Sequence, residues 1–314
     1  MSNLFRFNDW PFRTKILVAL ILIAVLPLSI ISAIQSITAA NSLRSIEFAA
    51  LQSTAAIKLD SLEDWFEDHR RDMELYASRP AQARSVARIP DALTELGDGD
   101  YQTGVARMVE LYSNPETIDA GDGSTYSVEH AFIAGIGNTF VQLYEYEDIY
   151  IVTTDGTVVY SFNKGAEFGT NLVDGPLADT GLGTAFRQML QASETEVTIL
   201  TDFEYYPPID DSAAFIATPF IADGEITAIA ITRIPTTRLD EIAQERTGLG
   251  ETGETYLVGE DKLFRTDSRF LEELGVTSTR NNPDIVVDTV SANAALAGEC
   301  GQAIITDYRG EEVF

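Results

Sequence analysis

The most apolar stretch of the chain lies near its N-terminus. Residues 16–34 read ILVALILIAVLPLSIISAI and contain no charged side chain. About 20 apolar residues are enough for a helix to cross a bilayer, and Pro27 is compatible with a membrane helix. We therefore predict a transmembrane helix over residues 16–36. The alternative is a cleaved signal peptide, whose apolar region usually spans only about 7–15 residues.

Positive charge beside this stretch predicts its orientation. Arg6, Arg13 and Lys15 precede the apolar residues, and Asp9 is the only acidic residue among them. Because basic residues are retained on the cytoplasmic side, we expect residues 1–15 to be a cytoplasmic tail of an inner-membrane protein. The remainder of the chain would then be periplasmic or extracellular.

Apolar residues then recur at three- and four-residue steps, which is typical of one face of a helix. They are Leu59, Leu62, Phe66, Met73 and Tyr76, and His69 lies on the same face. We predict that a long helix over residues 37–79 continues the membrane helix. Its apolar face fits either a parallel coiled coil with a second copy, which would give a homodimer, or packing on its own domain.

The pattern becomes β-rich from Phe140 onward. Asp155-Gly156 and Asp223-Gly224 predict two hairpins, because Asp-Gly is a frequent hairpin turn. The expected strands are 148–152 with 158–161, one through 197–203, and 214–219 with 226–233, and a short helix is expected over 184–191. These elements predict an antiparallel α+β domain over residues 80–246.

A similar pattern starts again after an expected helix over residues 237–246. Strands are predicted over 255–259, 262–266 and 303–308, with a turn at Glu260-Asp261. Two closing strands of the first domain have no counterpart before Phe314. We therefore expect residues 247–314 to be an incomplete second domain with an unpaired sheet edge.

Composition narrows the classes of partner. An apolar content of 45% in 314 residues can supply hydrophobic cores. The formal net charge of -28 opposes nucleic-acid binding, which needs clustered basic residues. We therefore expect no nucleic-acid partner. The one cysteine, Cys300, cannot form an internal disulfide.

Motifs for catalysis, cofactors and metals are weak. Residues 248–253, GLGETG, match the dinucleotide fingerprint, but a predicted helix precedes them and a strand follows, the reverse of the order that the motif requires. We interpret them as a turn between two domains. The Asp-Gly cluster at 119–124 lacks the ligand spacing of a calcium loop. With only His69 and His130 available for general-base chemistry, we expect no enzyme activity, no metal and no cofactor.

Aromatic residues gather on the predicted sheet. One interpretation is a small-ligand pocket on the sheet face, walled by aromatic rings and closed by the loop 168–171. The alternative is that the same rings pack in the core. The candidate ligand-binding aromatic residues are Tyr144, Tyr146, Tyr160, Phe203 and Tyr205.

Four segments resemble the double Cache sensory domain of bacterial transmembrane receptors, such as chemoreceptors and sensor kinases. They are residues 148–172 (DIYIVTTDGTVVYSFNKGAEFGTNL), 201–208 (TDFEYYPP), 213–234 (AAFIATPFIADGEITAIAITRI) and 248–270 (GLGETGETYLVGEDKLFRTDSRF). The resemblance covers about residues 60–314. It implies two PAS-like domains, of which the membrane-distal one binds metabolites such as amino or organic acids. It also implies a second membrane helix and an output domain beyond Phe314.

One departure from the family concerns the ligand. The amino-acid-binding members carry an Arg-x-Trp-Tyr group before the central strand and an Asp on the last distal strand. This chain has no such group before Val197, and Thr232-Arg233 stands in place of the Asp. Arg233 is therefore a further candidate ligand-binding residue, which would hold an anion by charge-assisted hydrogen bonds.

The sequence thus predicts the extracytoplasmic small-molecule sensing region of a transmembrane receptor, in which ligand binding shifts the helix over residues 59–76. The expected partners are a small-molecule ligand, the lipid bilayer and a second copy of the chain. The alternatives are a membrane-anchored extracytoplasmic hydrolase and a structural Cache module that binds nothing.

Overall fold

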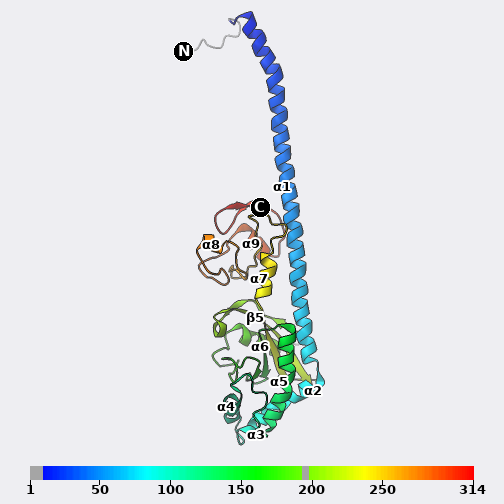
Figure 1. The fold of residues 1–314 in the computed structure, drawn as a ribbon, viewed down its shortest axis with the longest axis vertical. Coiled ribbons are helices and arrows are strands. Elements are labelled where there is room, and N and C mark those ends of the chain that lie inside the picture. Colours follow the sequence, from blue (N-terminus) through cyan, green and yellow to red (C-terminus); the bar gives the residue numbers. More distant parts are fainter. Residues whose placement is uncertain (1–9, 193–197) are drawn as a thin grey trace. The chain divides into compact units, whose positions relative to one another are not determined.

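The computed structural model describes residues 10–192 and 198–314 (Figure 1). The chain divides into two compact units, residues 1–55 and residues 56–314. Arg6 and Asp9, on which part of the predicted orientation rests, lie outside the described residues. The second unit contains every described strand.

Helix α1 runs without a break from Phe12 to Ala77, although it contains Pro27. One 18-residue window within it has a mean hydropathy of 2.9, and none of that window is buried. By length and composition, this helix can cross a membrane. The predicted membrane helix and the predicted long helix are therefore parts of one continuous helix.

Four helices come between α1 and the sheet. They are α2 (Pro80–Ala87), α3 (Ile89–Leu96), α4 (Tyr101–Tyr112) and α5 (Thr125–Tyr144). The sequence sets where the last two begin. Asp100 and Ser124 accept hydrogen bonds from the backbone N–H groups of Thr103 and Ser127, which would otherwise be unpaired at a helix N-terminus.

The sheet is antiparallel, with the order β2-β1-β6-β5-β3, and β4 also pairs with β5. Its strands are β1 (Asp148–Thr153), β2 (Val158–Ser161), β3 (Ile199–Leu200), β4 (Glu204–Tyr206), β5 (Asp211–Ala222) and β6 (Glu225–Ile234). Both predicted hairpins are confirmed. Gly156 and Gly224 adopt φ values of 95° and 86° in their turns, which glycine adopts without steric cost.

Successive side chains of β1 enter two separate cores, because neighbouring residues of a strand point to opposite faces. Ile149 and Ile151 belong to the helix-side core, which also contains residues of α1, α2 and α5. Tyr150 and Val152 belong to the α6-side core, with Phe186 of α6 (Gly181–Gln191). The predicted α+β class, a long N-terminal helix followed by an antiparallel-sheet domain, is confirmed.

The apolar face predicted on the long helix packs on its own domain. Met73 and Tyr76 are fully buried, and the Tyr76 ring lies 4.7 Å from the ring of Phe140 on α5. Leu59, which was predicted to share this face, is 55% exposed. Met73 and Tyr76 are therefore not free to form a coiled-coil seam with a second copy.

The strand predicted over residues 197–203 is divided into β3 and β4, and Val197 lies outside the described residues. The interruption has a local cause at Thr201. The backbone N–H of Phe215 donates to the side-chain Oγ1 of Thr201, at 2.9 Å, and not to its carbonyl as in a regular antiparallel ladder.

The second half of this unit contains less regular strand than predicted. Its elements are α7 (Thr237–Gln244), α8 (Leu271–Leu274), α9 (Val290–Leu296), β7 (Ile305–Thr306) and β8 (Glu312–Val313). The predicted strands 255–259 and 262–266 pair through one bridge, between Val258 and Phe264, and the second of them also bridges to Val286 and Arg280. The Thr266 hydroxyl accepts the hydrogen bond of the Leu257 N–H, at 3.2 Å, so a side chain again replaces a backbone carbonyl.

Lys58 ties α1 to α7. Its Nζ donates to the carbonyl oxygens of Ala243 and Glu245, each at 2.7 Å. These carbonyls lie at the C-terminal end of α7, where unpaired acceptors and the helix dipole favour a cation. The contact links the long helix to the element that leads from the sheet to the second half of the unit.

The packing of α1 can be tested by shortening one buried side chain. Met73→Ala should lower the free energy of unfolding by about 2–5 kcal/mol, because a cavity replaces the thioether in the helix-side core. Leu75→Ala on the same helix should change it by no more than about 0.5 kcal/mol, since Leu75 is 53% exposed. Denaturant titration of both variants, followed by circular dichroism, measures the difference. Equal losses would contradict the packing described for α1.

Candidate functional site

Ionisable side chains are buried together on the α6-side face of the sheet. We call Asp148, Tyr150, Glu167, Tyr206 and Arg233 the buried charge cluster. Asp148 is 1%, Glu167 2% and Arg233 8% exposed. Burying charged groups costs free energy unless they are paired and hydrogen-bonded, so the contacts of each member matter.

Strand pairing brings two members of the cluster together. In the antiparallel register of β1 and β6, Asp148 lies opposite Arg233. Tyr150, two residues after Asp148, points to the same face. Glu167 comes from the loop after β2, and Tyr206 is the last residue of β4. Residues far apart in the sequence therefore meet at one end of the sheet.

Glu167 lies at the centre of the cluster. Its Oε1 accepts hydrogen bonds from the hydroxyls of Tyr206, at 2.8 Å, and Tyr150, at 3.2 Å. The same oxygen lies 4.0 Å from Nη1 of Arg233. Burial, and then the nearby carboxylates, raise the pKa of both tyrosines. Both hydroxyls therefore stay protonated and donate to Glu167.

Arg233 already has a carboxylate partner at the edge of the cluster. Its Nε donates to Oε2 of Glu147 at 2.9 Å, and its Nη1 donates to the Tyr150 hydroxyl at 3.5 Å. The Glu147 side chain is 33% exposed, so this pair reaches solvent. Arg233 thus points into the cluster, a direction that strand alternation in the sequence had left open. Anion binding at Arg233 stays a prediction, and an anion there would compete with Glu147.

Asp148 is held by donors from the backbone and from a serine. It accepts from the N–H groups of Ile149 at 2.8 Å and Phe162 at 2.9 Å, and from the Ser161 hydroxyl at 3.3 Å. Burial raises the pKa of Asp148 to about 6, against the opposing charge of Arg233. This carboxyl group therefore changes its protonation near neutral pH.

Negative charge exceeds positive charge in this region. Asp148, Glu167 and Glu147 surround one guanidinium group, that of Arg233. A buried group with a perturbed pKa and charged partners is more frequent at binding and catalytic sites than elsewhere. The cluster offers carboxylate acceptors, a guanidinium donor and two phenols, which together can bind a polar small molecule.

Of the six residues predicted to bind ligand, the structure brings only Arg233 to the cluster. Tyr146, Tyr160 and Phe203 belong to the helix-side core. The Tyr160 hydroxyl donates to Asn138 at 2.6 Å, and the Tyr146 ring stacks on Phe140 at 5.1 Å. These are the contacts of core residues.

The other two predicted aromatic residues lie at the surface. Tyr144 is 36% and Tyr205 is 56% exposed, and the Tyr205 hydroxyl donates to Asp210 at 2.7 Å. The predicted pocket therefore combined rings that are buried in the helix-side core with rings that lie at the surface. The ligand-binding roles of these residues stay predictions.

The loop expected to close the pocket, residues 168–171, pairs with β2. The N–H of Val158 donates to the Thr170 carbonyl, and the N–H of Gly169 donates to the Val158 carbonyl, each at 2.9 Å. Gly169 has a φ of 78°, and a Cβ there would lie 2.2 Å from the Val109 side chain. The loop is therefore fixed between β2 and α4.

The candidate residues chosen from the sequence did not include Asp148, Tyr150, Glu167 or Tyr206. One signal was available for Asp148, because it begins an otherwise apolar strand and lies opposite Arg233 once the two hairpins are paired. Glu167 and Tyr206 lie in irregular segments, whose approach to the sheet has no periodic signal in the sequence.

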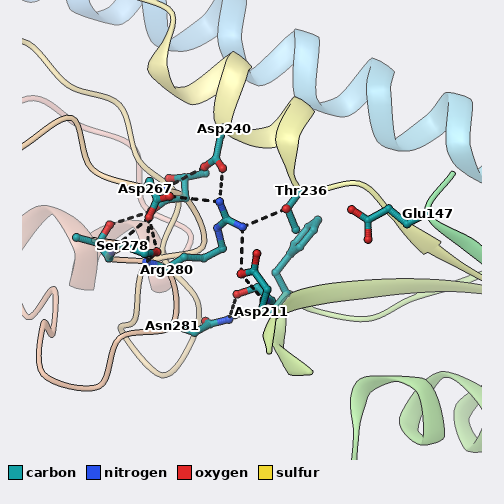
Figure 2. A network of polar contacts seen from close by, with 12 residues as sticks. Glu147, Asp211, Thr236, Asp240, Asp267, Ser278, Arg280 and Asn281 are labelled. Atoms are coloured by element: carbon teal, nitrogen blue, oxygen red, sulfur yellow. Dashed lines mark hydrogen bonds and ion pairs between the residues drawn. The ribbon is translucent and has the colours of Figure 1, made fainter. Parts of the chain in front are cut away.

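A second polar network joins the sheet to the second half of the unit, and Figure 2 shows it around Arg280. Arg280 Nη1 donates to Thr236 at 3.0 Å and to Asp211, at the start of β5, at 3.4 Å. Its Nη2 donates to Asp240 of α7 and, at 3.4 Å, to Asp267. One guanidinium therefore connects β5, α7 and the loop that carries Asp267.

Asn281, the next residue, adds contacts to the same junction. Its Nδ2 donates to the Ser212 hydroxyl at 2.7 Å and to the Phe203 carbonyl at 3.1 Å (Figure 2). Its Oδ1 accepts from Arg265 at 2.8 Å. Two consecutive residues thus fix the second half of the unit against the start of β5.

An acidic groove lies beside this junction. It is open, has a volume of about 580 Å³ and includes Asp202, Glu204, Glu260 and Asp261 in its lining. Arg265 already pairs with Asp202 at 2.7 Å and with Asp261 at 2.9 Å. Across residues 10–192 and 198–314, no group of three or more His, Cys, Asp or Glu side chains could hold a metal ion.

Comparisons with known proteins give structural matches only. No family model and no curated protein matches the chain. The sensor domain of the V. cholerae histidine kinase DctB is 12% identical, with a TM-score of 0.32, and the match covers 66% of this chain and 67% of that one.

Two chemoreceptor structures are similar to the same extent. The ligand-binding domain of Campylobacter jejuni Tlp3, in complex with 4-methylisoleucine, is 13% identical with a TM-score of 0.37, and the match covers 70% of this chain and 81% of that one. The ligand-binding domain of Pseudomonas fluorescens CtaA, in complex with L-serine, is 16% identical with a TM-score of 0.35. The match covers 64% of this chain and 85% of that one. All three are sensor or ligand-binding domains, the class that the sequence resembles.

Removal of Arg280 should loosen the junction. Arg280→Met leaves the partly buried Asp240 and Asp267 without their cation, and breaking a buried pair in this way costs about 3–5 kcal/mol. We expect faster hydrogen exchange over residues 263–282, measured by mass spectrometry. Arg238→Met is the matched control, because Arg238 pairs with Glu241 at the surface and should contribute less than about 1 kcal/mol. Unchanged exchange in Arg280→Met would contradict the assigned role.

Proposed function

We propose that the chain is the extracytoplasmic sensing region of a transmembrane receptor, and that residues 80–246, which we call the sheet domain, bind a small molecule at the buried charge cluster. The observation that carries this proposal is the set of contacts around Glu167, a carboxylate that is 2% exposed, accepts from two tyrosines and faces Arg233. Apolar residues would fill the same space with less loss of free energy, so a binding role explains these groups better than packing does.

The proposal assigns each part of the chain a place. Residues 1–15 are the cytoplasmic tail, and residues 16–36 cross the inner membrane. Residues 37–79 form the signalling helix. Residues 80–246 are the membrane-distal Cache domain, and residues 247–314 are part of the membrane-proximal one. The apolar length of α1 supports the membrane segment. The resemblance of residues 148–172 and 248–270 to double Cache domains supports the two-domain assignment.

Contacts within the second unit offer a route from the cluster to α1. Arg233 is near the end of β6, and Thr236 follows this strand and contacts Arg280. Helix α7 begins at the next residue, and its C-terminal carbonyls bind Lys58 of α1. A ligand that rearranges Arg233 would therefore act on α7 and on the helix that leads to the membrane. A coupling of about 1–3 kcal/mol between ligand and helix position is enough to signal.

The proposal includes a homodimer, since a second copy would convert a shift of α1 into a change between two helices. Met73 and Tyr76 are covered by their own domain. The contacts of such a dimer would therefore come from other residues of α1 or of the sheet domain.

A thermal-shift screen of the full chain in nanodiscs tests the proposal. Amino acids, organic acids and amines are the probes, and a bound ligand at about 100 times its Kd adds about 2.7 kcal/mol of stability. Glu167→Gln keeps the shape of the side chain but removes its charge, and should weaken the binding at least about tenfold, in line with the loss of one charged hydrogen bond. Glu260→Gln, an exposed glutamate, is the matched control.

The outcome also separates the alternatives. Recovery of the ligand chemically unchanged after long incubation favours a sensor, whereas its conversion would favour a membrane-anchored hydrolase. If no probe from the three classes stabilises the chain, the proposal is wrong and a structural module that binds nothing becomes the better interpretation.

A further inference from the structure

The loop after β2 directs the amine of a lysine into the sheet domain. Lys164 Nζ lies 4.4 Å from the centre of the Tyr160 ring and 4.2 Å from that of Phe168. It also lies 2.9 Å from Nε2 of His130 on α5. The direct neighbours of this amine are therefore two aromatic rings and an imidazole.

The hydrogen bonds of His130 define which of the two bases titrates. Its Nδ1 lies 2.9 Å from the Ile118 carbonyl, which can only accept, so Nδ1 carries the hydrogen and Nε2 accepts from Lys164. Burial, and then the charge of Lys164, lower the pKa of His130 to about 3. The imidazole therefore stays neutral, and Lys164 is the group that gains or loses a proton.

The backbone of Lys164 is held in an uncommon conformation. Its φ is 53°, in the left-handed region that few residues other than glycine adopt. Its N–H donates to the Ser161 hydroxyl at 3.0 Å, and that hydroxyl donates in turn to Asp148 at 3.3 Å. Ser161 thus connects the loop that carries Lys164 to the carboxylate in the buried charge cluster.

We propose that the sheet domain responds to pH through Lys164 and Asp148, which lie on either side of Ser161 and each take up a proton as the pH falls. The inference deepens the proposed function and rests on it in one respect, because Asp148 belongs to the cluster proposed as the ligand site. Proton uptake adds one positive charge to that site, at Asp148, and a second at the Lys164 amine, which lies against Tyr160 and Phe168 of the helix-side core.

The surroundings of both groups place their titration near neutral pH. Burial lowers the pKa of Lys164 to about 7, although the charge of Asp148 on β1 opposes this effect. Burial raises the pKa of Asp148 to about 6, opposed by Arg233 on β6 and reinforced by Glu167. Burial also raises the pKa of Tyr160 on β2, so this neighbour stays neutral.

The charge of the site then depends on pH. At about pH 8 the Asp148 carboxylate is charged and the Lys164 amine is neutral, whereas at about pH 5 the reverse holds. The faces of Tyr160 and Phe168 and the Nε2 of His130 can hold the ammonium group when it forms. A ligand with a cationic group should therefore bind more tightly at high pH, and one with an anionic group at low pH.

The two groups also affect stability with opposite signs. Between about pH 7 and 10 the unfolded chain binds the Lys164 proton and the folded chain does not, so this group makes stability rise with pH in that window. Between about pH 4 and 6 the folded chain binds the Asp148 proton and the unfolded chain does not, so this group makes stability fall as the pH rises there. The two contributions can therefore be separated in one titration.

The test uses the full chain in phosphatidylcholine nanodiscs and measures the unfolding temperature from pH 4 to pH 10, with protons as the only probe. Lys164→Met should make the rise between pH 7 and 10 less steep, although burial also lowers the pKa of Lys58, while Lys262→Met, a lysine paired at the surface with Asp288, should leave the rise unchanged. Asp148→Asn should make the fall between pH 4 and 6 less steep, although burial also raises the pKa of Asp72 and Asp240, and Asp223→Asn, in the exposed turn before β6, is its matched control.

The pH dependence of amide hydrogen exchange is a second measurement. If Lys164 only filled space in the core, replacing it would not change this pH dependence. After correction for the intrinsic effect of pH, peptides over residues 158–172 should exchange at least about five times faster on one side of pH 7 than on the other. Lys164→Met, or Lys164→Gln if the methionine variant does not fold, should lose this transition. If the transition persists in the Lys164 variant, or is absent from the wild-type chain, the inference is wrong.

These outcomes are distinct from failure of the proposed function. A metabolite that stabilises the chain without any effect of the Lys164 and Asp148 variants on the pH profile contradicts only the pH response. A pH transition lost in Lys164→Met, in a chain that no metabolite stabilises, contradicts only the ligand site.

Discussion

The pairing of β1 with β6 is the constraint on which the rest of the sheet domain depends. Its register places Ile149 and Ile151 toward the helices, and it sets Asp148 opposite Arg233 on the other face. One strand therefore contributes both to the core that holds α1 and to the cluster of charges. A shift of the β1–β6 register by one residue would move the side chains of each face to the opposite face. The pairing therefore fixes the helix-side core and the buried charge cluster together.

Local signals in the sequence were enough to predict the main elements of the fold. The two Asp-Gly turns and the apolar length of α1 depend on neighbouring residues, and the structure has both hairpins and the long helix. The division of the strand at Thr201 and the reduced pairing at Thr266 were not predictable. In each case a hydroxyl takes a hydrogen bond that a carbonyl would take in a regular ladder, and composition does not show which acceptor is used.

The candidate site was less predictable, because its members meet only through tertiary structure. Arg233 was identified from the sequence, whereas Glu167 and Tyr206 reach it from irregular segments. The predicted aromatic residues illustrate the same difficulty. Tyr160 and Tyr150 lie on adjacent strands, yet the first packs on the helix-side core and the second on the α6-side core, because Tyr160 lies opposite Ile151 and not opposite Tyr150. To identify a binding surface, one must know to which face of the sheet each side chain points, and not only on which strand it lies.

Charge in the buried cluster is balanced over a longer distance than its direct contacts show. Three carboxylates share one guanidinium, and Ser161 joins Asp148 to the backbone N–H of Lys164, whose amine lies farther away against Tyr160, Phe168 and His130. Since Lys164 has aromatic and imidazole neighbours, its charge is stabilised mainly by Asp148 and by the two rings. Loss of one charge therefore changes the free energy of the other, and the two protons are coupled. In the proposed sensor, ligand binding and proton uptake would therefore be linked, because a ligand that changes the charge at Asp148 would also change the pKa of Lys164.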